Sequence, residues 1–94
     1  MAQPMTLRVL TEAGIAVEDQ AVSIRAPGEV GYLGVLHNHA PLVTTLQPGT
    51  LTWRRSDGHS EQRRIGTGLL EVSRNTVTIL TSVIDAPRKD NSQT

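Results

Sequence analysis

The chain of 94 residues has the length of one domain and can bury one modest hydrophobic core. Nine basic and nine acidic residues give a formal net charge of zero, which argues against nucleic acid as the main partner because phosphate binding needs a surplus of positive charge. The absence of cysteine excludes disulfides and cysteine-based metal sites, and no segment has the composition of a signal peptide or a membrane-spanning helix.

Alternation of apolar and polar residues predicts β-strands along nearly the whole chain. The first is Met5–Thr11, and a turn at Gly14 separates it from a second strand over Ala21–Ala26. Turn sequences at 47–49, 56–58 and 74–75 separate later segments of the same kind. The further predicted strands are 32–36, 41–46, 50–55, 61–67, 69–73 and 76–84.

Short strands at this spacing are typical of an all-β sandwich or barrel. No window has the three- and four-residue spacing of apolar residues that an amphipathic helix needs. The sequence therefore predicts one all-β domain over residues 1–86, followed by a polar, disordered tail over 87–94.

The hairpin predicted around residue 57 carries a large apolar residue and four arginines. Trp53 is expected to face the other sheet and to belong to the core. The pairs Arg54-Arg55 and Arg63-Arg64 are expected to face each other across the hairpin, and opposed like charges would cost stability. Their partners are expected to be acidic residues such as Asp57, Glu61 or Glu71, or the surface of another subunit.

The segment 27–43 combines three evenly spaced glycines with His37 and His39. On a strand, residues two apart point the same way, so this pair could begin a zinc or iron site. A third ligand is needed, yet His59 is the one other histidine and no carboxylate occurs between Glu29 and Asp57. Histidines held in a loop or an interface are therefore favoured, and a small cupin-like metal-binding enzyme is the alternative.

Other chemistries fit this part of the chain less well. The glycines do not form G-x-G-x-x-G, and no helix follows that could bind phosphate. Ser56, Asp57 and His59 share one tight turn, where they rarely converge as a catalytic triad. The remaining interpretation of this segment is a shaped surface that binds another protein. In it, Tyr32 would be either an anchor residue of the protein contact or a residue that covers the edge of the sheet. A ligand-binding sandwich that uses Trp53 and Tyr32 is a weaker alternative.

The segment PGEVGYLGVLHNHAPLVTTLQPG, over residues 27–49, resembles the signature of the epsilon subunit of F-type ATP synthases, called delta in mitochondria. The opening LRVLTEAGIAVEDQAVSIRAPG and the later GTGLLEVSRNTVTILTSVI resemble the same family, so the likeness covers residues 5–84. The residues that match the signature are Pro27, Gly28, Gly31, Leu33, Gly34, Val35, Leu36, His39, Ala40, Pro41, Leu42, Pro48 and Gly49.

The resemblance implies a flattened β-sandwich of about ten short strands in the rotor stalk, without a catalytic, cofactor or metal site. It implies coupling of c-ring rotation to the gamma subunit in a proton- or sodium-translocating enzyme, peripheral to the cytoplasmic face of the bacterial inner membrane. By residue match, the c-ring would contact Glu29, Val30, Gly31, Tyr32 and Leu33. The gamma subunit would contact Thr11, His39, Thr44, Ser82 and Val83.

Three features depart from the family pattern. His37-Asn38 stands where Pro-Gly is usual, and Asn38 is expected to take the left-handed conformation that glycine would adopt. Tyr32 replaces a commonly acidic or polar residue, which would make the ring contact more apolar. Family members generally continue into an inhibitory two-helix domain that in some cases binds ATP. The 94 residues do not include this hairpin, as in a naturally short member or a fragment of a longer chain, so the sequence supports neither inhibition nor ATP binding.

Overall fold

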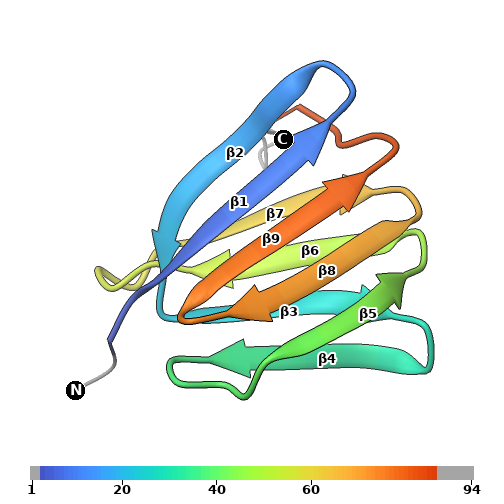
Figure 1. The fold of residues 1–94 in the computed structure, drawn as a ribbon. Helices are drawn as coiled ribbons and strands as arrows, with labels where there is room; N and C mark the ends of the chain where they lie inside the picture. Colours follow the sequence, from blue (N-terminus) through green and yellow to red (C-terminus); the bar gives the residue numbers. More distant parts are fainter. Residues whose placement is uncertain (1–2, 87–94) are drawn as a thin grey trace.

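Nine β-strands and no helix make up residues 3–86, the part of the chain that the computed structural model describes (Figure 1). The all-β prediction is thereby confirmed, and the tail predicted over 87–94 lies outside the described residues. The strands are β1 (Met5–Thr11), β2 (Gly14–Ala21), β3 (Ser23–Gly28), β4 (Gly31–Leu36), β5 (Leu42–Leu46), β6 (Gly49–Arg54), β7 (Ser60–Ile65), β8 (Gly68–Ser73) and β9 (Thr76–Thr81).

The strands form one curled sheet in the order β2-β1-β9-β8-β5-β3-β6-β7, with β4 paired to β3. The curl produces two layers, and Figure 1 shows β1, β9, β8 and β5 in front of β3, β6 and β7. We call β2, β1, β9, β8 and β5 the first layer, and β4, β3, β6 and β7 the second. The bridge between Gly28 and Leu46 joins the two layers. β1 runs parallel to β9, whereas the other paired strands are antiparallel.

The core fills the space between the layers with alternate residues of each strand. In β1 the residues Met5, Leu7 and Val9 are buried, while the residues between them are partly exposed. Trp53 of β6 is only 1% exposed, which confirms its predicted place in the core. Burying each such side chain contributes about 1.5–3 kcal/mol, and a one-residue slip in register would expose the whole set.

The strand predicted over Ala21–Ala26 is confirmed from Ser23 onward, but its predicted start is wrong because two strands meet there. β2 ends at Ala21 and β3 begins at Ser23, with the buried Val22 at the corner between them. The N–H of Val22 donates to the carbonyl of Arg54 at 2.8 Å, so the corner is attached to the end of β6. The chain therefore changes layers within a single residue that the alternation pattern does not distinguish.

The last predicted strand ends earlier than expected. β9 stops at Thr81, and Ile84 then forms a single bridge with Ile65 of β7. The predicted facing of the two arginine pairs is also wrong. Arg54 lies opposite Ser60, so Arg63 and Arg64 lie further along, opposite the first half of β6.

Two tight turns meet at the end of the first layer where β5 begins. Arg74 and Asn75 have φ angles of 51° and 62°, which confirms the turn predicted between β8 and β9. Asn38 has a φ of 69°, which confirms its expected left-handed conformation. The N–H of Asn38 donates to Asn75 Oδ1 at 2.6 Å, and Asn75 Nδ2 donates to Asn38 Oδ1 at 3.2 Å. This amide pair attaches the β4–β5 connection to the β8–β9 turn.

Candidate interaction surfaces

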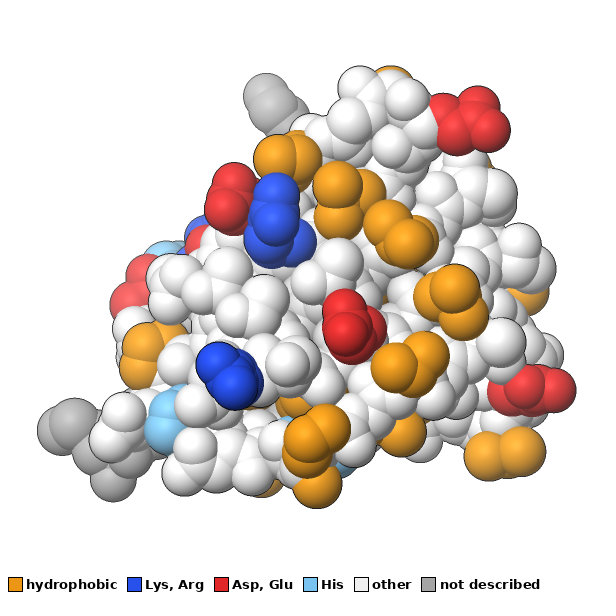
Figure 2. Space-filling model, viewed as in Figure 1, with side chains coloured by type: hydrophobic (Ala, Val, Ile, Leu, Met, Phe, Trp, Pro, Cys, Tyr) orange, Lys and Arg blue, Asp and Glu red, His pale blue; other side chains and the backbone are white. Residues whose placement is uncertain are grey.

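A row of exposed apolar side chains crosses the outer face of the first layer. The registers place Ile15 opposite Leu10, Leu10 opposite Leu80, and Leu80 opposite Leu69. Residues directly opposite each other on neighbouring strands share a face, so these four, which we call the apolar row, lie side by side. Ile15, Leu80 and Leu69 are 53%, 49% and 44% exposed. Figure 2 shows hydrophobic side chains gathered across this face.

A shallow hollow of about 410 Å³ lies alongside the apolar row, and Leu10, Leu80 and Leu69 of the row line it. Thr11 and Ser82 both line it, and the exposed Val83 follows directly. A Cβ added at Gly68 would lie 2.0 Å from the carbonyl oxygen of Leu80. The absence of a side chain at Gly68 therefore allows the backbones of β8 and β9 to approach each other closely at this point. The structure thus brings together three of the five residues predicted to contact a gamma subunit.

The other two predicted gamma contacts lie elsewhere in the first layer. Thr44 is half-buried in β5, opposite the buried Leu70. His39 precedes β5 and lies near the β8–β9 turn, at the end of the layer opposite to Thr11. Its ring Nδ1 is 2.7 Å from the carbonyl oxygen of Ala40. The five residues therefore extend along the whole layer instead of forming one cluster.

The glycine-rich segment forms the hairpin between β3 and β4. Glu29 and Val30 are its tip, and Val30 is fully exposed. Gly31 follows with a φ of 129°, a conformation that other residues rarely adopt. Thr45 Oγ1 donates to the carboxylate of Glu29, and Gln47 Nε2 donates to its carbonyl oxygen. These contacts hold the tip against the end of β5.

Tyr32 and Leu33, the last two predicted ring contacts, do not belong to the tip. Leu33 packs against the core. Tyr32 lies back over the second layer, where its hydroxyl oxygen accepts a hydrogen bond from the N–H of Thr50 at 3.0 Å. The guanidinium of Arg25 lies 4.5 Å from the centre of its ring. Tyr32 therefore covers the sheet, as one of the two interpretations of this residue expected.

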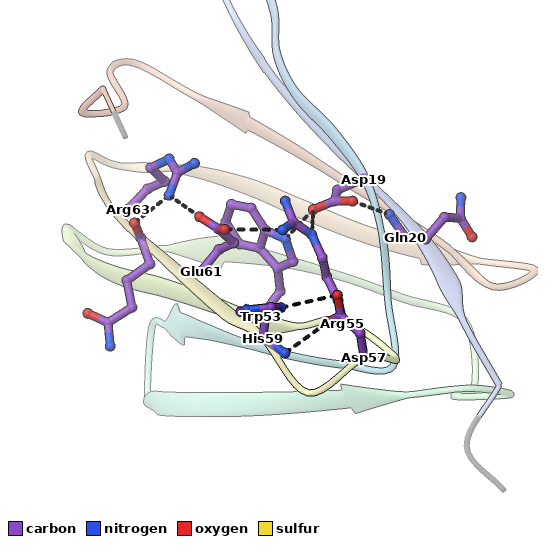
Figure 3. A network of polar contacts seen from close by, with 9 residues as sticks. Asp19, Gln20, Trp53, Arg55, Asp57, His59, Glu61 and Arg63 are labelled. Carbon is purple, nitrogen blue, oxygen red and sulfur yellow. Dashed lines mark hydrogen bonds and ion pairs between the residues drawn. The ribbon is translucent and has the colours of Figure 1, made fainter. Parts of the chain in front are cut away.

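A polar network links the two ends of the curled sheet (Figure 3). Asp19 of β2 accepts hydrogen bonds from Trp53 Nε1 at 2.8 Å and from Arg55 Nε at 2.7 Å. Arg55 Nη1 lies 3.2 Å from Glu61 of β7, and Glu61 also accepts from Arg63 Nη1 at 3.0 Å. Glu61 is thus confirmed as an acidic partner of these arginines, whereas the sequence did not indicate Asp19.

The network determines the charge state of Asp19. Partial burial alone would raise the pKa of Asp19, but hydrogen bonds from Trp53 and Arg55 outweigh it and hold that pKa below its ordinary value. Asp57, in the exposed β6–β7 turn, has a lowered pKa for a simpler reason. The backbone N–H and the ring of His59 both interact with its carboxylate. Both aspartates are therefore carboxylates at neutral pH.

The histidines lie apart in the fold. His37 and His39 belong to the β4–β5 connection, and His59 belongs to the β6–β7 turn, where its ring contacts Asp57. Within residues 3–86, no three His, Asp or Glu side chains gather as metal ligands would. The same residues contain no helix of the length and hydropathy needed to cross a bilayer.

Residues 4–86 match the family described as the ATP synthase, Delta/Epsilon chain, beta-sandwich domain. The chain belongs to this family. An ATP synthase epsilon chain of Moorella thermoacetica is 41% identical over 76 residues, which are 81% of this chain and 57% of that relative. One of Desulfosudis oleivorans is 35% identical over 91 residues, which are 97% of this chain and 67% of the relative. The ATP synthase delta/epsilon domain described above thus spans part of the length of these relatives.

Two solved assemblies contain a chain with the same fold. One is the mitochondrial ATP synthase of Euglena gracilis, OSCP/F1/c-ring, with a TM-score of 0.82 and 24% identity over 89% of this chain and 53% of that one. The other is the central stalk/c-ring of the mitochondrial ATP synthase of Tetrahymena thermophila, with a TM-score of 0.74 and 19% identity over 89% of this chain and 67% of that one. At these identities the likeness shows the fold alone.

Proposed function

We propose that this chain is a non-catalytic rotor domain of an F-type ATP synthase that links a membrane c-ring to a gamma subunit. The observation that carries the proposal is the apolar row, because an exposed apolar strip across four strands is the kind of surface that a partner covers. As part of that complex, the domain would lie at the cytoplasmic face of the bacterial inner membrane.

The gamma subunit would cover the apolar row and the hollow alongside it. Thr11, Ser82 and Val83 would then form a more polar rim, as protein interfaces usually have around an apolar centre. His39 would extend the contact along the same layer, whereas Thr44 lies on the inner face of β5, opposite the buried Leu70, and would reach gamma only through its partly exposed edge. His39→Ala is expected to weaken gamma binding without lowering the melting temperature. Within the described residues, the His39 ring makes one hydrogen bond, to the carbonyl oxygen of the neighbouring Ala40, so its loss removes little from the fold.

The c-ring would meet the hairpin tip of Glu29, Val30 and Gly31, with Tyr32 and Leu33 supporting the hairpin from behind. The tip projects the apolar side chain of Val30, while Glu29 of the same tip accepts hydrogen bonds from Thr45 and Gln47. A tip held in this way can transmit force into β5 instead of yielding. Because β5 pairs with β8 and β8 with β9, the path to the apolar row runs through hydrogen-bonded strands.

The test is co-purification of the chain with the gamma subunit of its own organism. Leu80→Glu places a charge in the middle of the apolar row and is expected to reduce gamma binding at least about tenfold, since a buried unpaired charge is costly. Leu36→Glu is the matched control, because Leu36 is 63% exposed on the outer face of the second layer. Equal binding by the two variants would contradict the assignment of the apolar row to gamma.

A further inference from the structure

The outer face of the second layer carries positive charge and faces away from the apolar row. Arg25 of β3, Arg54 of β6 and Arg64 of β7 all point outward, as their pairing with the partly exposed positions of neighbouring strands shows. The other outward positions of β3, β4, β6 and β7 are occupied by Ser, Thr, Gln, Gly, Tyr, Leu and Pro. Within residues 3–86, the outward positions of these four strands therefore carry three cations and no acid, and the one acid beside them is Asp85, which lines a hollow next to Arg64 at the edge of the face.

These three arginines have no ion pair within residues 3–86, in contrast to the arginines of the Asp19 network. Arg25 is nevertheless held in place, with its guanidinium 4.5 Å from the centre of the Tyr32 ring. A cation stacked on a ring keeps its N–H donors directed sideways, where they can bind an anion. The face thus offers oriented donors that no group of the described chain uses.

A groove of about 500 Å³ lies among these side chains. Tyr32 and Leu36 of β4 form its apolar walls and are 47% and 63% exposed, and Gly34 lies between them. Arg25 and Arg54 also line the groove. A Cβ added at Gly34 would meet nothing closer than the carbonyl oxygen of Ile24 at 3.9 Å, so packing does not require glycine here. The missing side chain leaves the groove open.

We propose that this groove binds an acidic segment of a partner protein. A carboxylate of the segment would bind Arg25 and Arg54, whose planar guanidinium groups match carboxylates with paired hydrogen bonds. A neighbouring apolar side chain would lie over Gly34, between Tyr32 and Leu36. Within the described residues β4 pairs only with β3, so its outer edge can align an extended chain beside the groove.

The size and chemistry of the groove favour a polypeptide over the other anionic partners. A nucleic acid would need a continuous line of cations to follow its phosphates, whereas the charge here is limited to three arginines on a chain with no net charge. An anionic membrane is attracted by clusters of four or more cations, and it offers no single side chain to fill the space over Gly34.

The test is a titration of the full chain, labelled with ¹⁵N, with the peptide Ser-Glu-Leu-Glu-Ser, followed by amide chemical shifts. Shifts are expected along β3, β4 and β6, and the Ser-Gln-Leu-Gln-Ser peptide should bind at least about tenfold more weakly, because the charged hydrogen bonds are lost. Arg25→Gln should weaken binding by a similar factor. Arg74→Gln, which removes an exposed arginine of the β8–β9 turn, should leave binding unchanged.

Gly34→Val fills the groove with a residue that suits a strand, and it is expected to abolish binding while the melting temperature is maintained. Should that variant fail to fold, Arg25→Gln still decides the question. Equal binding of both peptides, no effect of Arg25→Gln, or shifts confined to the apolar row would each overturn the proposal. Binding of phosphatidylglycerol vesicles through Arg25, without binding of the acidic peptide, would overturn it in favour of a lipid partner.

Discussion

Replacing Asp19 by alanine is expected to destabilise the domain by about 2–3 kcal/mol. Asp19 lies in β2, at one end of the curled sheet, and it binds Trp53 and Arg55 from the β6–β7 hairpin at the other end. Trp53 is 1% exposed, and a buried donor left without an acceptor costs about 1–3 kcal/mol. The Arg55 pair adds little to this, because that side chain is 39% exposed and water screens the charge.

Urea unfolding measured by the fluorescence of Trp53, the single tryptophan, provides the assay. With a slope of about 1–1.5 kcal/mol per molar urea for so small a domain, the midpoint should fall by about 2 M. Asp19→Asn keeps a neutral oxygen that can accept from Trp53, so its midpoint should fall about half as far. Asp57→Asn is the matched control in an exposed turn and should leave the urea midpoint nearly unchanged. If Asp19→Ala lowers the midpoint no more than this control does, the network does not hold the ends of the sheet together.

Three further predictions concern pH and two glycines. The pKa of Asp19 is below its ordinary value of 3.8, so the stabilisation that the Asp19 carboxylate provides is complete above pH 3.8 and is lost as the pH falls through the lower pKa of the folded state. The difference in urea midpoint between the native chain and Asp19→Asn should therefore shrink in acid, and a constant difference would argue against the pKa shift. Gly68→Ala should cost about 2 kcal/mol or more of folding stability in thermal or urea unfolding, because the added Cβ would clash with the Leu80 carbonyl. Gly34→Ala should be neutral within about 0.5 kcal/mol, and equal losses of stability in the two variants would contradict the close approach of β8 and β9. Gly31→Val should cost about 1–3 kcal/mol of folding stability through backbone strain alone, since a Cβ added at Gly31 would have nothing within 4 Å. The same variant should reduce ATP-driven ion pumping in the assembled complex, and normal pumping would count against a role of the tip.

Short-range features of the fold were predictable because neighbouring residues determine them. The left-handed conformations of Asn38 and Asn75 follow from the tolerance of asparagine for that region. The alternation in β1 predicts its buried face, and the same reasoning places Trp53 in the core. β2 escaped prediction because most of its side chains are exposed, so it lacks the apolar alternation that identifies a strand.

The candidate surfaces were predictable only in part. The family resemblance indicated Thr11, Ser82 and Val83, and the structure gathers these residues at one hollow. Nothing in the sequence indicated the apolar row itself, because Leu10, Leu80 and Leu69 are ordinary members of separate strands. These leucines become neighbours because β1 pairs in parallel with β9, which brings together segments about seventy positions apart in the sequence.

By itself, the sequence determined the all-β class, most of the turns and the family, because these depend on residue types at short, regular spacing. The tertiary structure alone decided which strands are neighbours, where the chain changes layers at Val22, and that Asp19 meets Trp53 and Arg55. The physical reason is that alternation specifies which side of a strand is buried but not which strand pairs with it. Partner and register are chosen by the packing of the whole core, and the outer faces that other proteins can reach are a consequence of that choice.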